Sequence, residues 1–253
     1  MKKLTVMLLS LLLVLGSILS LTPAWAAGQK WEVEADLAFN SKYVWRGMNL
    51  VDDWVIQPSL TVSRGGFSAN LWANYEPTDQ TGHQKKITEV DLSAQYTFEL
   101  GGFSIPLGLI HYLFPNTSAP ATTEVFAGVS YHWLVTPSLT IYHDLDQAHG
   151  QYLALALDYA YQLPLGLKQA SLGLELGAGV GYAGSDYNQF YYGVDEAAWS
   201  DWYCSLSVPL GLLDDKLTIT PRITYTALID DELKKTTDKD TNTFFGLSVT
   251  YAF

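Results

Sequence analysis

The feature that most constrains the fold of this chain is an alternation of apolar and polar residues that recurs from residue 31 to residue 253. Trp31, Val33 and Ala35, for example, alternate with Glu32 and Glu34. Successive side chains of a β-strand point to opposite faces, so a period of two predicts strands with one apolar and one polar face. The pattern recurs in residues 53–63, 87–99, 152–162 and 243–253, and the chain is therefore predicted to be all-β.

Turn signals divide this pattern into strands. Short connections rich in Gly, Pro or Asp, such as residues 64–66 and 100–102, mostly alternate with longer polar connections. Single-chain bacterial outer-membrane barrels have an even number of strands, short periplasmic turns and long external loops. The prediction is a transmembrane antiparallel up-and-down β-barrel of about 12 strands. Its strands are expected at residues 30–46, 53–63, 67–76, 87–99, 103–114, 122–134, 138–144, 151–162, 168–182, 199–210, 216–228 and 242–253.

The N-terminus has the features of a secretory signal peptide. Lys2 and Lys3 precede an apolar run over residues 4–21, and Ala24 and Ala26 occupy the small-residue positions of a cleavage site. We expect residues 1–26 to be removed and residues 27–253 to form a barrel in the outer membrane of a bacterial cell. A retained membrane anchor is the alternative, because the apolar run is close to the length that spans a bilayer.

Aromatic residues favour a barrel over a soluble β-sandwich, which alternation alone does not exclude. One set lies at strand ends near the short turns or termini, and a second set lies near the long loops. Two such belts are typical of the two interfaces of a membrane barrel. The first set is Trp31, Phe67, Phe103, Trp133 and Phe253, and the second is Tyr43, Trp45, Trp54, Tyr75, Phe114 and Trp202.

The block at residues 40–47, Asn-Ser-Lys-Tyr-Val-Trp-Arg-Gly, is followed by a polar loop and by Gln-Pro-Ser at residues 57–59. Over residues 39–75 the chain resembles the TorF-type porin family, which carries a Ser-x-Tyr-x-aromatic-Arg-Gly block at the end of its first strand. The resemblance implies an exported barrel. By strand parity, Tyr43 and Trp45 are expected to face lipid, and Lys42 and Arg46 the lumen or rim. Arg46 either neutralises interior carboxylates or lines a constriction.

The charge of the chain limits its partners. Its formal net charge is −12 at pH 7, which argues against nucleic acid and is compatible with cationic or sugar-like solutes. The polar faces of the strands are predominantly acidic and are predicted to line a pore that attracts cations, or else to form a paired polar plug. The candidate pore-lining residues are Glu32, Glu34, Asp36, Arg46, Glu89, Asp91, Asp158, Glu175, Asp201 and Arg222.

Small residues occupy the inward positions of two predicted neighbouring strands. They either leave volume for a solute or permit close approach of a loop or another wall. A narrow channel is favoured, because twelve strands exceed the eight whose lumen side chains just fill. These residues are Ala154, Ala156, Ala160, Gly173, Gly177, Gly179 and Gly181.

Chemistry other than conduction has weaker support. His143, Asp144, Asp146 and His149 match no strong metal-binding spacing, so we expect a solvated loop, no metal and no cofactor. An embedded hydrolase would need a Ser, a His and an orienting group close together, and no Gly-x-Ser-x-Gly motif is present. Cys204 shares the apolar parity and is expected to face lipid.

The sequence therefore predicts a porin, not an enzyme, for passive diffusion of small polar or cationic solutes, with membrane lipid as its surroundings. Two alternatives remain open. One is a closed outer-membrane barrel with a role in adhesion or as an envelope scaffold. The other is a barrel enzyme that modifies lipid, and it would be supported by a Ser–His pair near the outer rim.

Overall fold

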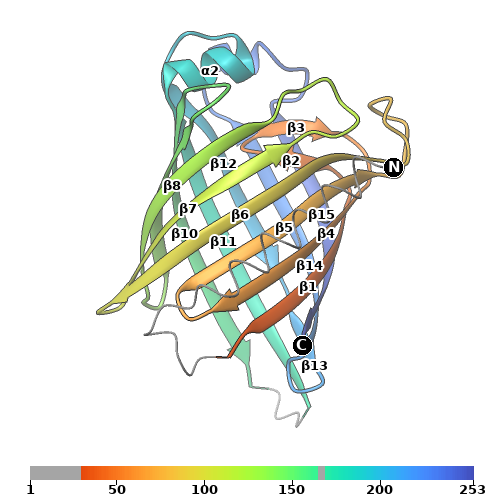
Figure 1. Cartoon of the computed structure of the whole chain (residues 1–253), viewed down its shortest axis with the longest axis vertical. Coiled ribbons are helices and arrows are strands. Elements are labelled where there is room, and N and C mark those ends of the chain that lie inside the picture. The colour runs from red at the N-terminus through yellow and green to blue at the C-terminus, as the bar shows by residue number, and fades with distance from the viewer. Residues whose placement is uncertain (1–29, 165–168) are drawn as a thin grey trace. The chain divides into compact units, whose positions relative to one another are not determined.

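The computed structural model describes residues 30–164 and 169–253, and its barrel occupies the unit Glu32–Phe253. The predicted signal peptide, residues 1–26, lies outside the described residues. Within the described part, twelve strands form a closed antiparallel barrel, as predicted (Figure 1). They are β1 (Glu32–Asn40), β4 (Val55–Arg64), β5 (Phe67–Glu76), β6 (Lys86–Leu100), β7 (Phe103–Leu113), β8 (Thr122–Tyr131), β9 (Thr136–Asp144), β10 (Gln151–Leu163), β11 (Ala170–Ala183), β12 (Ala198–Ser207), β14 (Leu217–Leu228) and β15 (Thr241–Ala252).

The barrel closes because every strand of the wall pairs with two neighbours. β1 pairs with β4 and with the last strand, β15, and β10 pairs with both β9 and β11. The short strand β13 (Leu210–Leu212) continues β12 beyond Pro209 and pairs with the same two strands, β11 and β14. A closed sheet leaves no strand edge unpaired, which the hydrocarbon core of a membrane requires.

The outer surface of the barrel is apolar. Leu109, Leu157 and Leu247, from three separate strands, are 44%, 54% and 43% exposed. Such a surface is stable against lipid tails, whereas a soluble protein would bury it. The apolar faces therefore point outward, and the soluble sandwich is excluded. The barrel belongs in the bacterial outer membrane.

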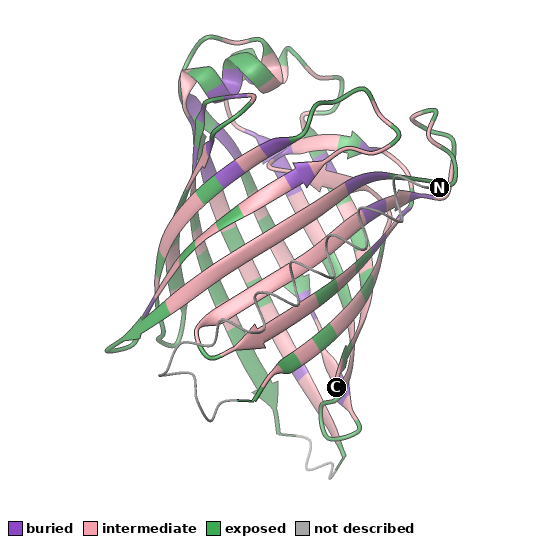
Figure 2. Cartoon of the chain, in the orientation of Figure 1, coloured by how far each residue is buried: buried purple, intermediate pink, exposed green. Residues whose placement is uncertain are grey.

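The interior is polar and hydrogen-bonded. A chain of side-chain amides crosses four neighbouring strands, in which Asn40 donates to Gln57 at 2.8 Å, Gln57 to Asn74 at 3.0 Å, and Asn74 to Thr88 at 3.0 Å. Figure 2 shows that buried residues gather towards the end of the barrel that carries the long loops. The core of this protein is therefore at one end of the lumen.

The loops lie where the sequence predicted them, and two contain helices. Helix α2 (Ser185–Tyr192) follows β11 and α3 (Asp231–Lys234) follows β14. Figure 1 shows α2 at the loop end of the barrel, opposite the short turns. No helix in the described residues is long and apolar enough to span a membrane.

The predicted first strand, residues 30–46, is too long. β1 ends at Asn40, and a separate hairpin follows, made of β2 (Tyr43–Trp45) and β3 (Met48–Val51). The last contacts between β1 and β15 join Ser41 to Phe245. The Ser41 N–H donates to the Phe245 carbonyl, and the Ser41 Oγ accepts from the Phe245 N–H. Strand parity does not extend past this break, so the expectation that Tyr43 and Trp45 face lipid is wrong.

Candidate pore constriction at the loop end of the barrel

The hairpin β2–β3 folds into the loop end of the lumen and meets α2 there, and we call these two elements the plug. The ring of Trp45 lies 6.3 Å from that of Tyr112 on β7. It also lies 6.3 Å from the ring of Tyr187 and 5.2 Å from that of Tyr191, both on α2. Tyr187 is only 1% exposed. The plug is thus a small aromatic core in the mouth of the barrel.

Arg46, at the tip of the hairpin, forms the central contact of the plug. Its two terminal nitrogens donate to the two carboxylate oxygens of Glu124 on β8, both at 2.8 Å. The guanidinium carbon lies 4.5 Å from the ring centroids of Trp45 and Tyr142 and 4.3 Å from that of Tyr152. A bidentate pair combined with aromatic faces is a strong way to hold a cation away from water.

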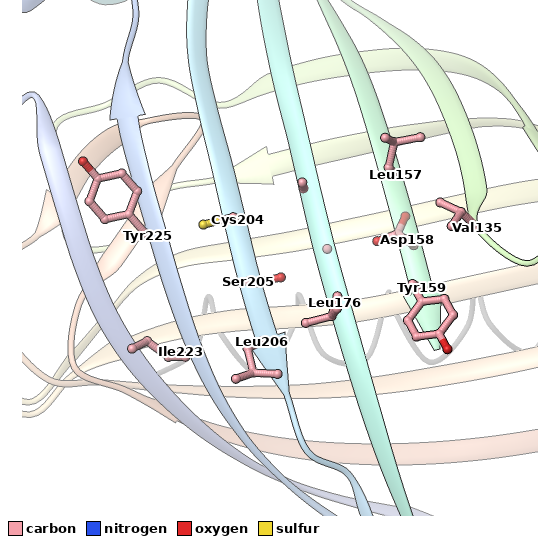
Figure 3. A pocket seen from close by; sticks show the side chains of 12 residues that line it. Val135, Leu157, Asp158, Tyr159, Leu176, Cys204, Ser205, Leu206, Ile223 and Tyr225 are labelled. Carbon is pink, nitrogen blue, oxygen red and sulfur yellow. The ribbon is translucent and has the colours of Figure 1, made fainter. Parts of the chain in front are cut away.

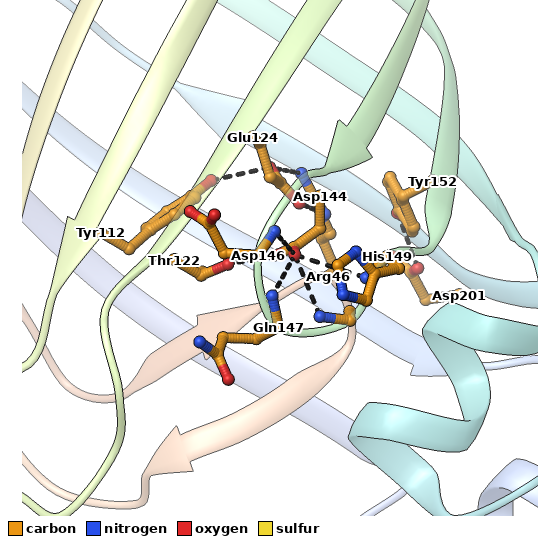
Figure 4. Close-up of polar contacts among 11 residues, drawn as sticks. Arg46, Tyr112, Thr122, Glu124, Asp144, Asp146, Gln147, His149, Tyr152 and Asp201 are labelled. Atoms are coloured by element: carbon orange, nitrogen blue, oxygen red, sulfur yellow. Dashed lines mark hydrogen bonds and ion pairs between the residues drawn. The ribbon is translucent and has the colours of Figure 1, made fainter.

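The surroundings of Arg46 keep it charged. Burial alone would lower the pKa of its guanidinium, but interactions with Tyr187 and Glu124 outweigh burial and raise that pKa. Glu124 also accepts a hydrogen bond from Tyr112 at 2.9 Å (Figure 4). The ion pair is therefore satisfied on both sides, as a buried pair must be to persist.

Two glycines permit the close contacts of the plug. Gly47 has φ = +80°, and a Cβ added there would lie 2.6 Å from the Cβ of Asp201 on β12. A Cβ at Gly150 would lie 2.3 Å from the backbone nitrogen of Tyr187 on α2. Only glycine fits at either position, so the hairpin tip approaches β12 and α2 approaches the loop after β9.

The loop after β9 is organised by the carboxylate of Asp144. One carboxylate oxygen accepts the Thr122 hydroxyl at 2.5 Å, and the other accepts the backbone N–H groups of Asp146, Gln147 and Ala148 at 2.8–3.0 Å (Figure 4). No group of three or more His, Cys, Asp or Glu side chains in the described residues could hold a metal ion. Asp144 thus uses its carboxylate to hold the loop that contains Asp146 and His149.

Two further acids lie on the lumen side of β6, beside the plug. Glu89 is 7% exposed, and Oδ1 of Asp91 is buried without a hydrogen-bond partner among the described residues. Tyr43 of the hairpin hydrogen-bonds Glu89, and burial together with the charges of Glu89 and Asp91 raises the pKa of its phenol. The wall beside the Arg46–Glu124 pair therefore carries two further acids.

A cavity of about 120 Å³ lies between the hairpin and this wall. Its lining combines aromatic rings, two apolar side chains and the Glu89 carboxylate. The lining residues are Trp45, Met48, Leu50, Glu89, Tyr112, Phe114, Thr122 and Tyr191.

The ten predicted pore-lining residues fall into two groups. Arg46, Glu89, Asp91 and Asp201 come together around the plug, where Asp201 accepts the Tyr152 hydroxyl at 2.8 Å. The others lie on strands farther from it: Asp36 accepts from Thr250 at 2.7 Å, Arg222 donates to Ser207 at 3.0 Å, and Ser207 is also the register partner of Glu175. The members of this second group are Glu32, Glu34, Asp36, Asp158, Glu175 and Arg222.

Sequence reasoning missed Glu124 and the tyrosines that surround Arg46. Glu124 is the only charged residue of β8, and it has the inward parity of that strand. That signal alone could have identified it as the partner of an inward Arg. Tyr142, Tyr152 and Tyr187 gave no comparable signal, because tyrosines are numerous and spread along the whole chain.

The small residues on β11 do not leave an open wall. A Cβ at Gly179 would lie 2.5 Å from the ring of Tyr203, and one at Gly181 would lie 2.1 Å from the hydroxyl of Tyr152. Rings from the adjacent strands thus lie over these glycines. The volume expected there for a solute is occupied by side chains.

A polar cluster lies at the opposite end of the lumen, near the short turn at residues 101–102. The Ser104 hydroxyl lies 2.7 Å from Nε2 of His132 and 2.7 Å from both carboxylate oxygens of Glu99. Here the hydroxyl lies between acid and imidazole. In a hydrolytic triad the imidazole lies between the serine hydroxyl and the acid, so this arrangement does not activate the serine.

An apolar groove of about 540 Å³ crosses the outer surface of β10, β11, β12 and β14 (Figure 3). Cys204 lies in it beside Leu206 and Tyr225, and the cysteine is exposed. Its position on the outer face agrees with the expected lipid-facing role.

Comparison with solved structures gives barrels of low sequence identity. LpxR from Salmonella typhimurium superposes with a TM-score of 0.53 at 8% identity, covering 87% of this chain and 99% of that one, and this likeness shows the fold alone. The NanC porin (TM-score 0.47, 13% identity, 87% and 98% covered) and the KdgM porin (TM-score 0.48, 12% identity, 88% and 99% covered) are also similar.

No protein of curated function matches the sequence. A family model does match, over residues 24–244, and its description is a bacterial protein of unknown function (Gcw_chp). The TorF-type name that the first loop suggested is not confirmed. Since the match extends over most of its length, the chain belongs to the Gcw_chp family of bacterial proteins.

Proposed function

We propose that the protein is a narrow outer-membrane channel for passive diffusion of small polar or cationic solutes, with the plug as its constriction. One observation carries the proposal: Glu89 is buried and Asp91 is half-buried on the lumen wall beside the plug, and neither is ion-paired within the described residues. A buried acid without a basic partner attracts cations from solution.

Within the described residues, the constriction has more acidic than basic side chains. The positive charge of Arg46 is neutralised by its bidentate pair with Glu124, so it does not offset Glu89 and Asp91. The rings of Trp45, Tyr112 and Tyr191 lie around Glu89 at the loop end of the barrel. A solute entering at the loop end thus meets acidic side chains and aromatic rings.

The test is single-channel conductance of the refolded barrel in a planar bilayer, with reversal potentials in asymmetric KCl. We expect discrete steps with cation selectivity, and a reversal potential closer to zero in the double variant Glu89→Gln/Asp91→Asn. Glu196→Gln, an acid on an exposed external loop, is the matched control and should leave selectivity unchanged. A conducting barrel whose selectivity is the same in the double variant would overturn the role of these two acids.

A second candidate is a closed barrel with an external role in adhesion or as an envelope scaffold. The packing of the plug favours it, because Arg46, Glu124 and Tyr187 are all buried. A correctly folded barrel that gives no conductance at any voltage would support this candidate. Neither function requires a catalytic residue.

A further inference from the structure

The cavity between the hairpin and β6–β8 has a lining that suits one class of small molecule. Four of its lining side chains are aromatic, namely Trp45, Tyr112, Phe114 and Tyr191, and Glu89 supplies a carboxylate. We propose that this cavity binds a small organic ammonium ion. The inference deepens the proposed function by naming a solute class, but the binding itself requires no conduction.

The first argument is that the wall beside the cavity holds two acids without a basic partner among the described residues. Glu89 is 7% exposed, and within the described residues its hydrogen-bond partner is the neutral phenol of Tyr43. The neighbouring Asp91 has a buried carboxylate oxygen with no partner in the same part of the chain. Buried charges are normally paired, and neither acid has an ion pair with a base in the described part of the chain.

The second argument is that the plug already holds one organic cation by the same means. The guanidinium of Arg46 lies over the rings of Trp45, Tyr142 and Tyr152 and pairs with a buried carboxylate, Glu124. The cavity shares Trp45 with that arrangement and has its own carboxylate, Glu89. It repeats the aromatic rings and the acid, but no side chain of the described residues supplies the cation.

The third argument excludes other ligands. A metal ion needs several oxygen, nitrogen or sulfur ligands, and the described residues contain no such group. A sugar needs many polar partners, but Thr122 already donates to Asp144 and Tyr112 to Glu124. Met48 and Leu50 suit the methyl or methylene groups beside an ammonium nitrogen, and aromatic faces attract its charge.

The volume of the cavity agrees with a small organic ammonium ion. A cavity of 120 Å³ corresponds to roughly four water molecules at about 30 Å³ each. A small ammonium ion fills such a space, whereas an oligosaccharide or a peptide does not. The cavity lies at the loop end of the lumen, so its ligand comes from the external solution.

The test is calorimetric titration of the full mature barrel with choline. The detergent is a polyoxyethylene ether, which carries neither an ammonium group nor a sugar. 3,3-Dimethylbutan-1-ol, the uncharged carbon isostere of choline, and glucose are titrated in parallel. We expect choline to bind and the isostere to bind at least roughly tenfold more weakly, because it lacks the charge that faces Glu89 and the rings.

Variants then locate the site. Glu89→Gln should weaken choline binding roughly tenfold or more, since it leaves the cation without its carboxylate. Tyr191→Leu should weaken it less, through the loss of one ring, and Glu196→Gln should have no effect. Heat-modifiable migration on a gel shows that each variant is folded, so loss of binding in a folded Glu89→Gln barrel supports the site.

Three results would overturn the proposal: no choline binding to the folded barrel, equal affinity for choline and its isostere, or binding of glucose in place of choline. These results are separable from failure of the channel. Choline binding without conductance would support the ammonium site and contradict the channel. Conductance without choline binding would support the channel and contradict the ammonium site.

Discussion

Arg46 is the residue on which the plug depends, because its side chain is only 10% exposed and its charge is paired within the protein. Glu124 supplies both of its carboxylate hydrogen bonds, and three aromatic rings lie within 4.5 Å of the guanidinium carbon. Removing one partner of such a pair leaves the other charge buried and unpaired. The plug is therefore more sensitive to a single neutralisation here than to any change at the exposed ion pairs.

Glu124→Gln should loosen the plug while leaving the barrel wall intact. An unpaired buried charge destabilises the folded plug by about 3 kcal/mol, so amide exchange in β2 and β3 should accelerate roughly a hundredfold. Hydrogen exchange read by mass spectrometry measures this directly. Arg46→Lys should also accelerate exchange, because lysine cannot form the bidentate pair.

The control for this measurement is Lys234→Ala, which removes the exposed pair between Lys234 and Asp231 on α3. Exposed pairs contribute little to stability, so exchange in the hairpin should not change. Unchanged exchange in Glu124→Gln would show that the pair does not hold the plug.

At the scale of elements, the hairpin β2–β3 is the part of the chain whose tip packs against β8, α2 and β12 in the mouth of the barrel. It is tied to the wall by the Arg46–Glu124 pair and to neighbouring loops by Asp52, which pairs with both Lys42 and Lys239. The hairpin begins and ends at neighbouring positions, since Tyr43 pairs with Val51. It is thus an insertion that can be removed without displacing β1 or β4.

Replacing residues 43–51 with Gly-Ser-Gly tests whether the hairpin is the constriction. Because paired Cα atoms lie about 5 Å apart, three residues can join Lys42 to Asp52 without strain. Single-channel conductance should rise several-fold if the hairpin narrows the mouth. A folded variant with the conductance of the parent chain would place the constriction elsewhere in the lumen.

The wall was predictable from the sequence, but the plug was not. Strands follow from alternation and turn residues, which are local, so each predicted strand matches a strand of the wall apart from the end of the first. The course of the chain after Asn40 depends on contacts with Glu124, Tyr187 and Asp201, which lie 78 or more residues away. No local pattern encodes contacts of that separation, and the parity argument for Tyr43 and Trp45 therefore failed.

At the scale of the whole molecule, the orientation of the two faces decides where the protein can exist. Its apolar side chains cover the outside and its amides and acids line the inside, the reverse of a soluble protein. The assignment of the acidic candidates to a pore stays a prediction, which rests on strand parity within unbroken strands. How they are neutralised was not predictable, since the partners lie on other strands.

Leu247→Arg tests this orientation at the middle of β15. A charged residue on the lipid face near the bilayer centre costs roughly 2–4 kcal/mol, and this should appear as a lower free energy of unfolding in equilibrium denaturant titrations in vesicles. The neighbouring variant Ser248→Arg points into the lumen and should cost less. An equal cost for the two variants would contradict the assignment of the faces.

The long sequence separations within the plug also determine the order in which the molecule can assemble. The hairpin belongs to the N-terminal part of the chain, yet its tip contacts β8, α2 and β12. These contacts exist only after the later strands have been synthesised, inserted and joined to β1. The plug is therefore the last part of the protein to form, and its formation marks the completion of barrel biogenesis.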